Sequence, residues 1–252
     1  MLLAPKPGIV YGPVRSRRLG RSLGINLLPA GRKTCTFDCR YCQYGWAGPC
    51  SPAGLGDHPF PSVGEVVDAL ARTLSRLPEP PAFLTFSGNG EPTLHPSFGE
   101  IVDGVGRLRN RMAPEARLAI LSNSSEVGRP EVREALGRLD VRIMKLDAGS
   151  QATLLAYNRP APGVRFERIL EGLAALPQVT IQTLFCEGPA GNLDPESLSP
   201  WFESVRLIHP QLVQIYSLDR QSPYPRLVKA STERLEAVRN GLAARGVVAE
   251  VA

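Results

Sequence analysis

The stretch Ala82-Phe-Leu-Thr-Phe-Ser-Gly-Asn-Gly-Glu-Pro92 is a short apolar run that ends in a glycine-rich turn. The amphipathic pattern of residues 97–112 follows it, so the two together predict one βα unit. The same alternation recurs along the chain. We expect six strands, each aliphatic or β-branched and each ending in polar or glycine-rich residues, at 23–28, 82–87, 116–122, 141–147, 179–185 and 212–217.

Helical patterns lie between and after these strands, at 63–77, 97–112, 130–139, 163–176, 195–208 and 231–244. Each connection is long enough to return the chain parallel to the preceding strand. Six such units with right-handed crossovers predict an α/β fold, a partial (β/α)6 barrel with a parallel sheet, because a closed barrel needs eight. Loops at the carboxyl ends of parallel strands build the active sites of such folds, so the residues just after each strand should carry function.

The composition indicates one domain that spans residues 1–252, with residues 1–22 as a basic N-terminal extension packed on the barrel. The apolar fraction of 43% and the charged fraction of 21% are ordinary for a soluble globular protein. No apolar stretch approaches the roughly 18 residues of a membrane span, and the start lacks the features of a signal peptide. We therefore expect a cytoplasmic protein without a membrane partner. The net charge of +5 suggests acidic or phosphorylated partners only weakly.

A cysteine-rich loop follows the first expected strand, and residues 33–45 read Lys-Thr-Cys-Thr-Phe-Asp-Cys-Arg-Tyr-Cys-Gln-Tyr-Gly. Three of the five cysteines, Cys35, Cys39 and Cys42, stand in C-x3-C-x2-C spacing, which favours a metal site in a reducing compartment over a disulfide framework. A [4Fe-4S] cubane with three cysteine ligands keeps one iron open, whereas structural zinc is usually closed by four protein ligands. The alternative is a zinc site completed by Cys50 or a histidine, but a paired C-x2-C partner is missing.

With Tyr41 directly before Cys42, this spacing resembles the signature of the radical S-adenosylmethionine (SAM) superfamily. The resemblance implies a SAM-dependent iron–sulfur enzyme of the oxidoreductase or transferase type. In that superfamily the amino and carboxylate groups of SAM chelate the open iron, and the reduced cluster passes an electron to the sulfonium. A 5′-deoxyadenosyl radical results and abstracts a substrate hydrogen. Flavodoxin or ferredoxin is the expected electron donor, and Tyr41 is expected beside the cofactor.

The turn after the second expected strand takes the place of the superfamily's Gly-Gly-Glu-Pro segment. Gly88 and Gly90 allow the backbone to approach a ligand closely, and Glu91 offers a carboxylate to the SAM ammonium group. Asn89 stands between the two glycines and belongs to the same expected cofactor site. An ordinary glycine-rich turn is the structural alternative.

Polar residues also end the later strands. The resemblance implies that this rim holds the ribose and carboxylate of SAM, with Asp147 or Asn123 as the ribose contact. Lys145 shares a face with Asp147 because strand side chains alternate. A Lys–Asp pair that only stabilises the rim is an equal alternative. The weaker choices for the adenine lie on the fifth and sixth strands: Ile181, Gln182 and Tyr216.

Four stretches resemble the wyosine-synthetase-related group of the superfamily: YGPVRSRR (11–18), SGNGEPTL (87–94), VRIMKLDA (141–148) and VQIYSLDR (213–220). The resemblance implies the same fold and cofactor. It does not imply the same substrate, because wyosine synthetases carry N-terminal cysteines for a second cluster and no cysteine precedes Cys35 here. Only Cys50 and Cys186 remain for a second cubane, which is too few. We expect Cys186 to pack as a small apolar side chain, with a hydrogen-atom donor or nucleophile as the alternative.

The substrate is the open part of the interpretation. A basic run, Arg15, Arg17, Arg18 and Arg21, could bind phosphates of RNA or of a phosphorylated small molecule, and a solvated edge is its alternative. Arg220 and the Asn158-Arg159 pair are further candidate anion contacts. The catalytic candidates are Lys145, Asp147, Arg220 and Cys186. Two other functions remain open: an activase that generates a glycyl radical on a protein partner, and a non-catalytic iron–sulfur or zinc binding module.

Overall fold

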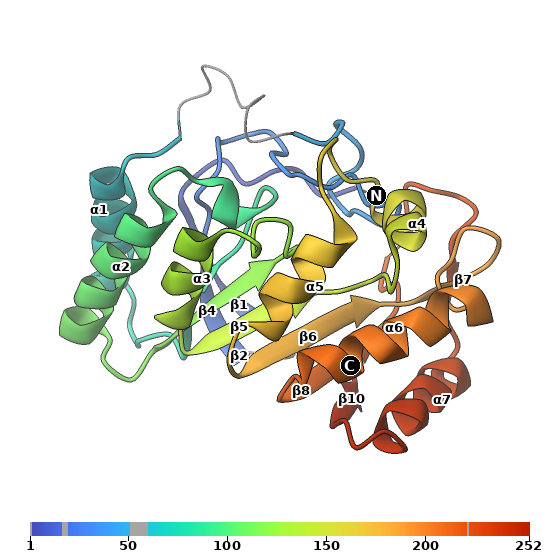
Figure 1. The fold of residues 1–252 in the computed structure, drawn as a ribbon. Helices are drawn as coiled ribbons and strands as arrows, with labels where there is room; N and C mark the ends of the chain where they lie inside the picture. Colours follow the sequence, from blue (N-terminus) through green and yellow to red (C-terminus); the bar gives the residue numbers. More distant parts are fainter. Residues whose placement is uncertain (1, 17–19, 51–59, 221) are drawn as a thin grey trace.

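A computed structural model describes residues 2–16, 20–50, 60–220 and 222–252. Within them the chain forms one curved sheet of eight strands in the order β1-β2-β3-β4-β5-β6-β8-β10, with the larger helices along its outer side (Figure 1). The strands are β1 (Val10–Ser16), β2 (Gly20–Ile25), β3 (Phe83–Phe86), β4 (Arg117–Ser122), β5 (Val141–Lys145), β6 (Val179–Leu184), β8 (Leu212–Tyr216) and β10 (Ala249–Val251).

A helix follows each of the six expected strands. These helices are α1 (Val63–Leu74), α2 (Phe98–Met112), α3 (Pro130–Gly137), α5 (Phe166–Ala174), α6 (Pro195–Ile208) and α7 (Thr232–Ala243). Neighbouring strands from β2 to β10 pair in parallel, in the order in which they occur along the chain. The predicted α/β class and the mostly parallel sheet of a partial barrel are confirmed.

Two strands at the edges of the sheet were not expected. β1 pairs antiparallel with β2, so part of the segment assigned to an extension packed on the barrel is instead an edge strand of the sheet. Its Gly12-Pro13 step hides the strand pattern, because proline is tolerated in edge strands but argues against a central one. β10 pairs with β8 over only three residues, too few to show a periodicity.

The main hydrophobic core lies between the sheet and the helices. Fully buried strand residues such as Leu84, Met144 and Ile181 belong to it, together with Leu70 and Val105 from the helices. The alternate strand positions face the inside of the curve. Lys145 and Gln182, which are in register on β5 and β6, belong to this second set.

The carboxyl ends of the strands meet at one rim, where the chain also forms short elements. These are η2 (Pro92–Leu94), α4 (Gln151–Thr153), the π-helical η3 (Leu154–Asn158), and the antiparallel pair β7 (Cys186–Glu187) and β9 (Val228–Lys229). The cysteine loop leaves β2 at the same rim. In the described part of the chain no helix is both long and apolar enough to cross a bilayer.

Candidate functional site

The cysteine loop is fastened on one side to residues 88–91, which we call the first support. Thr34 donates its N–H to the carbonyl of Asn89 at 2.7 Å, and Glu91 donates its N–H to the carbonyl of Thr34 at 3.1 Å. Gly90 has a φ of 146°, and a Cβ there would lie 1.8 Å from the Thr34 carbonyl oxygen. The glycine is therefore required because the cysteine loop itself approaches this backbone so closely.

Residues 157–161 run along the other side of the loop and form the second support. Four backbone hydrogen bonds join it to the loop: Ala161 N to Thr36 O at 2.7 Å, Asp38 N to both Asn158 O and Arg159 O at 3.1 Å, and Arg40 N to Tyr157 O at 3.1 Å. It begins within η3, whose π turn is closed by the bond from Arg159 N to Leu154 O. Single π turns are frequent at functional sites, and no motif in the sequence indicated this one.

The three thiols lie half-buried between the two supports. The side-chain amide of Asn123 donates to the Cys35 sulfur, and that of Asn158 to the Cys39 sulfur, each at 3.4 Å. Burial, followed by the charge of Asp147, raises the pKa of Cys39 to about 12, and burial also raises the pKa of Cys35. N–H donors stabilise bound thiolates and tune iron–sulfur clusters. Three thiols, two of them with such donors, are a set of ligands that fits a [4Fe-4S] cluster.

The zinc alternative requires a different arrangement. In the part of the chain that the structure describes, no three His, Cys, Asp or Glu side chains surround one position that a single metal ion could occupy. A cubane does not require this, because each thiolate binds a different iron. The backbone of Cys50 is next to the loop, because its N–H donates a hydrogen bond to the Cys35 carbonyl at 2.7 Å.

A buried ion pair inside the loop was missed from the sequence. The Lys33 ammonium donates to the Asp38 carboxylate at 2.7 Å and to the carbonyl oxygen of Gly45 at 3.0 Å. Burial lowers the Lys33 pKa, but Cys42 and Asp38 outweigh this effect and the pKa is raised. The pair ties the two ends of the loop together and places a positive charge near the thiols. In sequence, charges five residues apart on a loop look solvated.

Glu91 is fully buried at the end of the first support. Its Oε1 accepts from the backbone and hydroxyl of Thr93 and from the hydroxyl of Ser122, and its Oε2 accepts from the backbone of Asn123 at 2.5 Å. Burial raises the Glu91 pKa, and these hydrogen bonds oppose the increase. The carboxylate therefore holds the ends of β3 and β4 together. A contact with the SAM ammonium would have to use Oε2, which has a single partner.

Gly88 and Asn89 contact earlier parts of the chain, and for the Asn89 side chain these contacts replace the expected one with the cofactor. The Asn89 side chain accepts from Lys6 N at 2.6 Å and donates to the carbonyls of Lys6 and Pro29. A Cβ at Gly88 would lie 2.6 Å from the side-chain oxygen of Asn26. Asn89 is fully buried against Lys6, Asn26 and Pro29, so its side chain is used within the protein.

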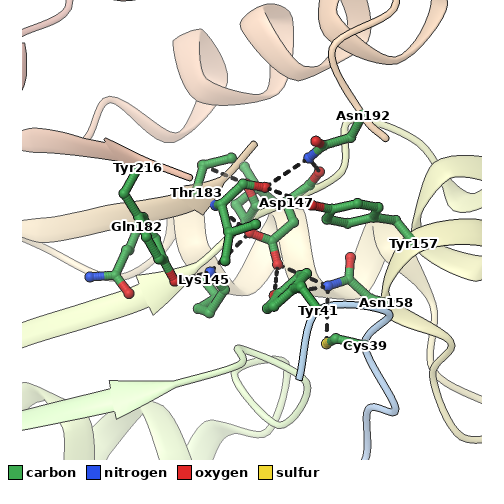
Figure 2. A network of polar contacts seen from close by, with 12 residues as sticks. Cys39, Tyr41, Lys145, Asp147, Tyr157, Asn158, Gln182, Thr183, Asn192 and Tyr216 are labelled. Atoms are coloured by element: carbon green, nitrogen blue, oxygen red, sulfur yellow. Dashed lines mark hydrogen bonds and ion pairs between the residues drawn. The ribbon is translucent and has the colours of Figure 1, made fainter. Parts of the chain in front are cut away.

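Asp147 is the centre of a second polar network, near the second support (Figure 2). Its Oδ1 lies 3.0 Å from the Lys145 ammonium and accepts from Leu184 N at 2.9 Å. Its Oδ2 accepts from the Asn158 amide at 2.9 Å and from the Tyr41 hydroxyl. The Lys–Asp pair weighed from the sequence is thus present. With both carboxylate oxygens filled, Asp147 positions its neighbours, and a ribose contact would have to displace one of them.

Lys145 is enclosed by aromatic rings as well as by Asp147. Its ammonium donates to the Tyr216 hydroxyl at 3.0 Å and lies 5.3 Å from the ring centre of Tyr41 and 4.9 Å from that of Tyr216. Burial lowers the Lys145 pKa, but Asp147 and Tyr216 outweigh it, so the pKa is raised. Lys145 is therefore a fixed cation at neutral pH.

The adenine candidates on β6 lie on opposite faces of the sheet. Gln182 is on the inner face, where its amide donates to the Gln214 side chain at 3.0 Å. Ile181 is fully buried in the main core and faces the helices, in register with Met144. Ile181 is therefore not available to a cofactor, because neighbouring strand residues point to opposite sides.

Cys186 is fully buried on β7, where it packs with Tyr157, Leu184, Ala190 and Leu227. Burial is the largest cause that raises its pKa to about 11. These surroundings are those of a packed apolar side chain, the role expected from the sequence.

The described members of the basic run, Arg15 and Arg21, lie at the other end of the sheet. Arg15 and Arg21 oppose each other in the β1–β2 hairpin, at the amino end of β2, whereas the cysteine loop leaves its carboxyl end. Arg21 forms an ion pair with Glu79. Arg17 and Arg18 lie outside the described residues. A phosphate bound by Arg15 or Arg21 would therefore be held at the opposite end of β2 from the cysteines.

A different cationic surface borders the cysteine loop. Trp46, 42% exposed, lies 5.8 Å from the ring of Tyr224, with Arg159 stacked on Trp46 and Arg40 on Tyr224, both at 4.8 Å. Tyr224 also lines a surface hollow that contains Arg220 and Lys229. We call these six residues the cation–aromatic surface. Only Arg159 and Arg220 were candidates from the sequence, and Trp46, four residues after Cys42, was the available signal for the rest.

Comparison with protein families agrees with this geometry. The model of the radical SAM superfamily matches residues 33–188, which include the cysteine loop, both supports and Asp147. A UPF0026 protein of Synechocystis sp. is 34% identical over 224 residues, a match that covers 86% of this chain and 78% of the relative.

Solved structures show the same fold. A radical SAM methyltransferase from Sphaerobacter thermophilus superposes with a TM-score of 0.60 at 17% identity, over 92% of this chain, which spans 65% of the methyltransferase chain. TYW1 with a lysine-pyruvate adduct bound gives a TM-score of 0.58 at 13% identity, over 88% of this chain and 73% of that one. These identities establish the fold alone. The cysteine loop, its donors and the family match together show that this chain belongs to the radical SAM superfamily.

Proposed function

We propose that Cys35, Cys39 and Cys42 hold a [4Fe-4S] cluster and that the chain uses it to cleave SAM reductively. The observation that carries the proposal is the cysteine loop itself, fastened on both sides, with amide donors at two of its three sulfurs. When bound, the cluster and SAM would supply an electron and a 5′-deoxyadenosyl radical. Flavodoxin or ferredoxin in the cytoplasm would provide the electron.

The protein's own contribution is to fix charge and orientation. Lys33 offsets negative charge at the thiolates, and Asp147 holds Tyr41 beside Cys42. Lys145 presents a positive charge to an anionic group at the rim. A lysine adduct with pyruvate, as in the TYW1 structure, needs a neutral amine for attack on the carbonyl. The ion pair with Asp147 favours the ammonium form of Lys145, so an adduct of this kind would require Asp147 to release the lysine or to accept its proton.

Anaerobic reconstitution tests the proposal. We expect about four iron and four sulfide per chain, and 5′-deoxyadenosine release when SAM and dithionite are added. Alanine at Cys35, Cys39 or Cys42 should abolish that release, whereas the control Cys50→Ala should keep it. Tightly bound zinc without iron would refute the proposal and favour a binding module.

For the substrate, we propose a phosphate-bearing molecule with a planar ring, such as RNA or a nucleotide. The cation–aromatic surface offers four cations and two aromatic rings on the cysteine side of the sheet. Cationic side chains bind phosphates, and exposed aromatic rings stack on bases. The wyosine-synthetase-related resemblance is consistent with this class of substrate but does not identify it.

Trp46 provides a direct measurement, because Trp201 is 1% exposed and a ligand at the surface should quench Trp46 alone. A single-stranded RNA oligonucleotide and adenosine monophosphate are the two probes. Arg220→Ala/Lys229→Ala should weaken RNA binding and reduce its salt slope by about 1.4 for two lost phosphate contacts. The control pair Arg15→Ala/Arg21→Ala should leave both unchanged. If neither probe binds at low salt, a protein substrate, as for an activase, is favoured instead.

A further inference from the structure

Two asparagines at the rim contact cluster cysteines in the same way. Asn123, in the loop after β4, donates to the Cys35 sulfur, and Asn158, at the end of η3, donates to the Cys39 sulfur, both at 3.4 Å. A hydrogen bond to a ligating sulfur stabilises the additional negative charge of a reduced cluster. Both residues are therefore expected to raise the cluster's reduction potential.

The two side chains differ at their oxygens. The Asn123 oxygen accepts from Ser125 N at 2.8 Å. The Asn158 residue is only 2% exposed, and its side-chain oxygen is buried without a hydrogen-bond partner among the described residues. A buried acceptor without a partner is rare in folded proteins and costs about 1–3 kcal/mol. It indicates a donor that arrives with a ligand.

The orientation of the Asn158 amide is determined by its neighbours. Its nitrogen faces the Asp147 carboxylate at 2.9 Å and the Cys39 sulfur, both of which are acceptors. Exchanging nitrogen and oxygen would place an acceptor against acceptors. The oxygen therefore stays on the other side, turned away from Cys39 (Figure 2). Asn158 also lines a small cavity together with Asn123, Lys145 and Asp147.

We propose that the Asn158 oxygen accepts a hydrogen bond from SAM, from its ammonium group or a ribose hydroxyl, while the Asn158 nitrogen holds the Cys39 thiolate. This inference rests on the proposed function. A donor at the amide oxygen polarises the amide and strengthens its N–H bond to sulfur. Binding of SAM would thus raise the reduction potential of the cluster through Asn158, so that the electron is accepted more readily once SAM is in place.

Asn123 was expected from the sequence to contact the SAM ribose, but its amide nitrogen donates to Cys35 and Thr36 and its oxygen accepts from Ser125. Its side chain therefore has no unpaired group left for the ribose, and it is the matched control because it donates to a thiolate but has a satisfied oxygen. Wild type, Asn158→Ala and Asn123→Ala are reconstituted, checked for iron content, and measured for SAM affinity by equilibrium dialysis and for midpoint potential by anaerobic titration with and without SAM. Both variants should lower the potential of the SAM-free cluster. Asn158→Ala alone should weaken SAM binding, by about five- to tenfold, and should reduce the shift in potential that SAM causes.

If Asn158→Ala does not retain iron, Asn158→Ser provides the same comparison, because it removes the amide oxygen but keeps a polar side chain near Asp147. Two fragments of SAM identify the donor. If the Asn158 variant binds methionine more weakly than wild type does, the ammonium is the donor; if it binds methylthioadenosine more weakly, a ribose hydroxyl is the donor. Unchanged SAM affinity in the Asn158 variants, or an equal loss in Asn123→Ala, would overturn the inference. A wild-type protein that binds no SAM would instead refute the proposed function.

Discussion

The two supports of the cysteine loop resemble each other in design and differ in charge. Each fastens the loop by backbone hydrogen bonds, and each adjoins a buried carboxylate with four donors, Glu91 for the first and Asp147 for the second. The donors to Glu91 are all neutral. Those to Asp147 include the Lys145 ammonium. The first support is therefore a rigid joint held by close backbone packing, whereas the second is an electrostatic joint that depends on a buried ion pair.

The largest expected effect breaks the first support. In Gly90→Ala the new Cβ would lie 1.8 Å from the Thr34 carbonyl oxygen. The backbone fixes the positions of both atoms, so the loop must move away. We expect no cluster after reconstitution, measured as iron and sulfide per chain.

Gly163→Ala separates this clash from simple backbone strain. Gly163 also has a positive φ, 88°, but nothing lies within 4 Å of its Cβ position. Its substitution should cost about 1–2 kcal/mol of unfolding free energy and leave the cluster in place. A Gly90→Ala protein with full iron content would show that the first support is not a rigid joint.

Breaking the second support should have the next largest effect. Asp147→Asn removes the partner of a largely buried ammonium, and breaking such a pair typically costs about 3–5 kcal/mol. Urea denaturation of the cluster-free protein measures it. A loss below about 1 kcal/mol would mean that Lys145 finds another partner and that the electrostatic interpretation is wrong.

Glu91→Gln should be milder. The amide keeps one acceptor oxygen for Thr93 and Ser122 but places an N–H group against the backbone N–H of Asn123. One lost hydrogen bond with a buried donor left unsatisfied costs about 1–3 kcal/mol. The same denaturation series compares it with Asp147→Asn, and a larger loss for Glu91→Gln would reverse the ranking of the two supports.

The smallest effect is a dependence on pH beside the first support. Burial lowers the pKa of His95. In the neutral ring, Nε2 donates to the Pro61 carbonyl at 2.8 Å and Nδ1 accepts from Ser97 N. A lowered histidine pKa gives stability that is complete above the unfolded value of 6.5 and is lost as the pH falls. Wild type should therefore lose more stability than His95→Gln between pH 7.5 and 5.5. Equal losses would contradict this assignment.

The sequence by itself determined the βα order and indicated the three cysteines that we propose as cluster ligands. Local periodicity separates strands from helices, and three cysteines within one short loop need no distant partner to indicate a metal site. The Lys145–Asp147 pair could also be anticipated, because two residues apart on a strand share a face. Edge strands β1 and β10 were missed because a proline step and a short length remove the periodic signal.

Only the tertiary structure decided what the rim residues do. Gly88 and Asn89 match a cofactor motif in sequence, yet they bind Asn26 and Lys6, which lie more than 60 residues away along the chain. The second support is a π turn whose partners come from the cysteine loop, so its role exists only after both segments meet. Hydrogen-bond saturation is a property of packed neighbours and not of residue type. For that reason the unpartnered oxygen of Asn158 could be found only in the folded chain.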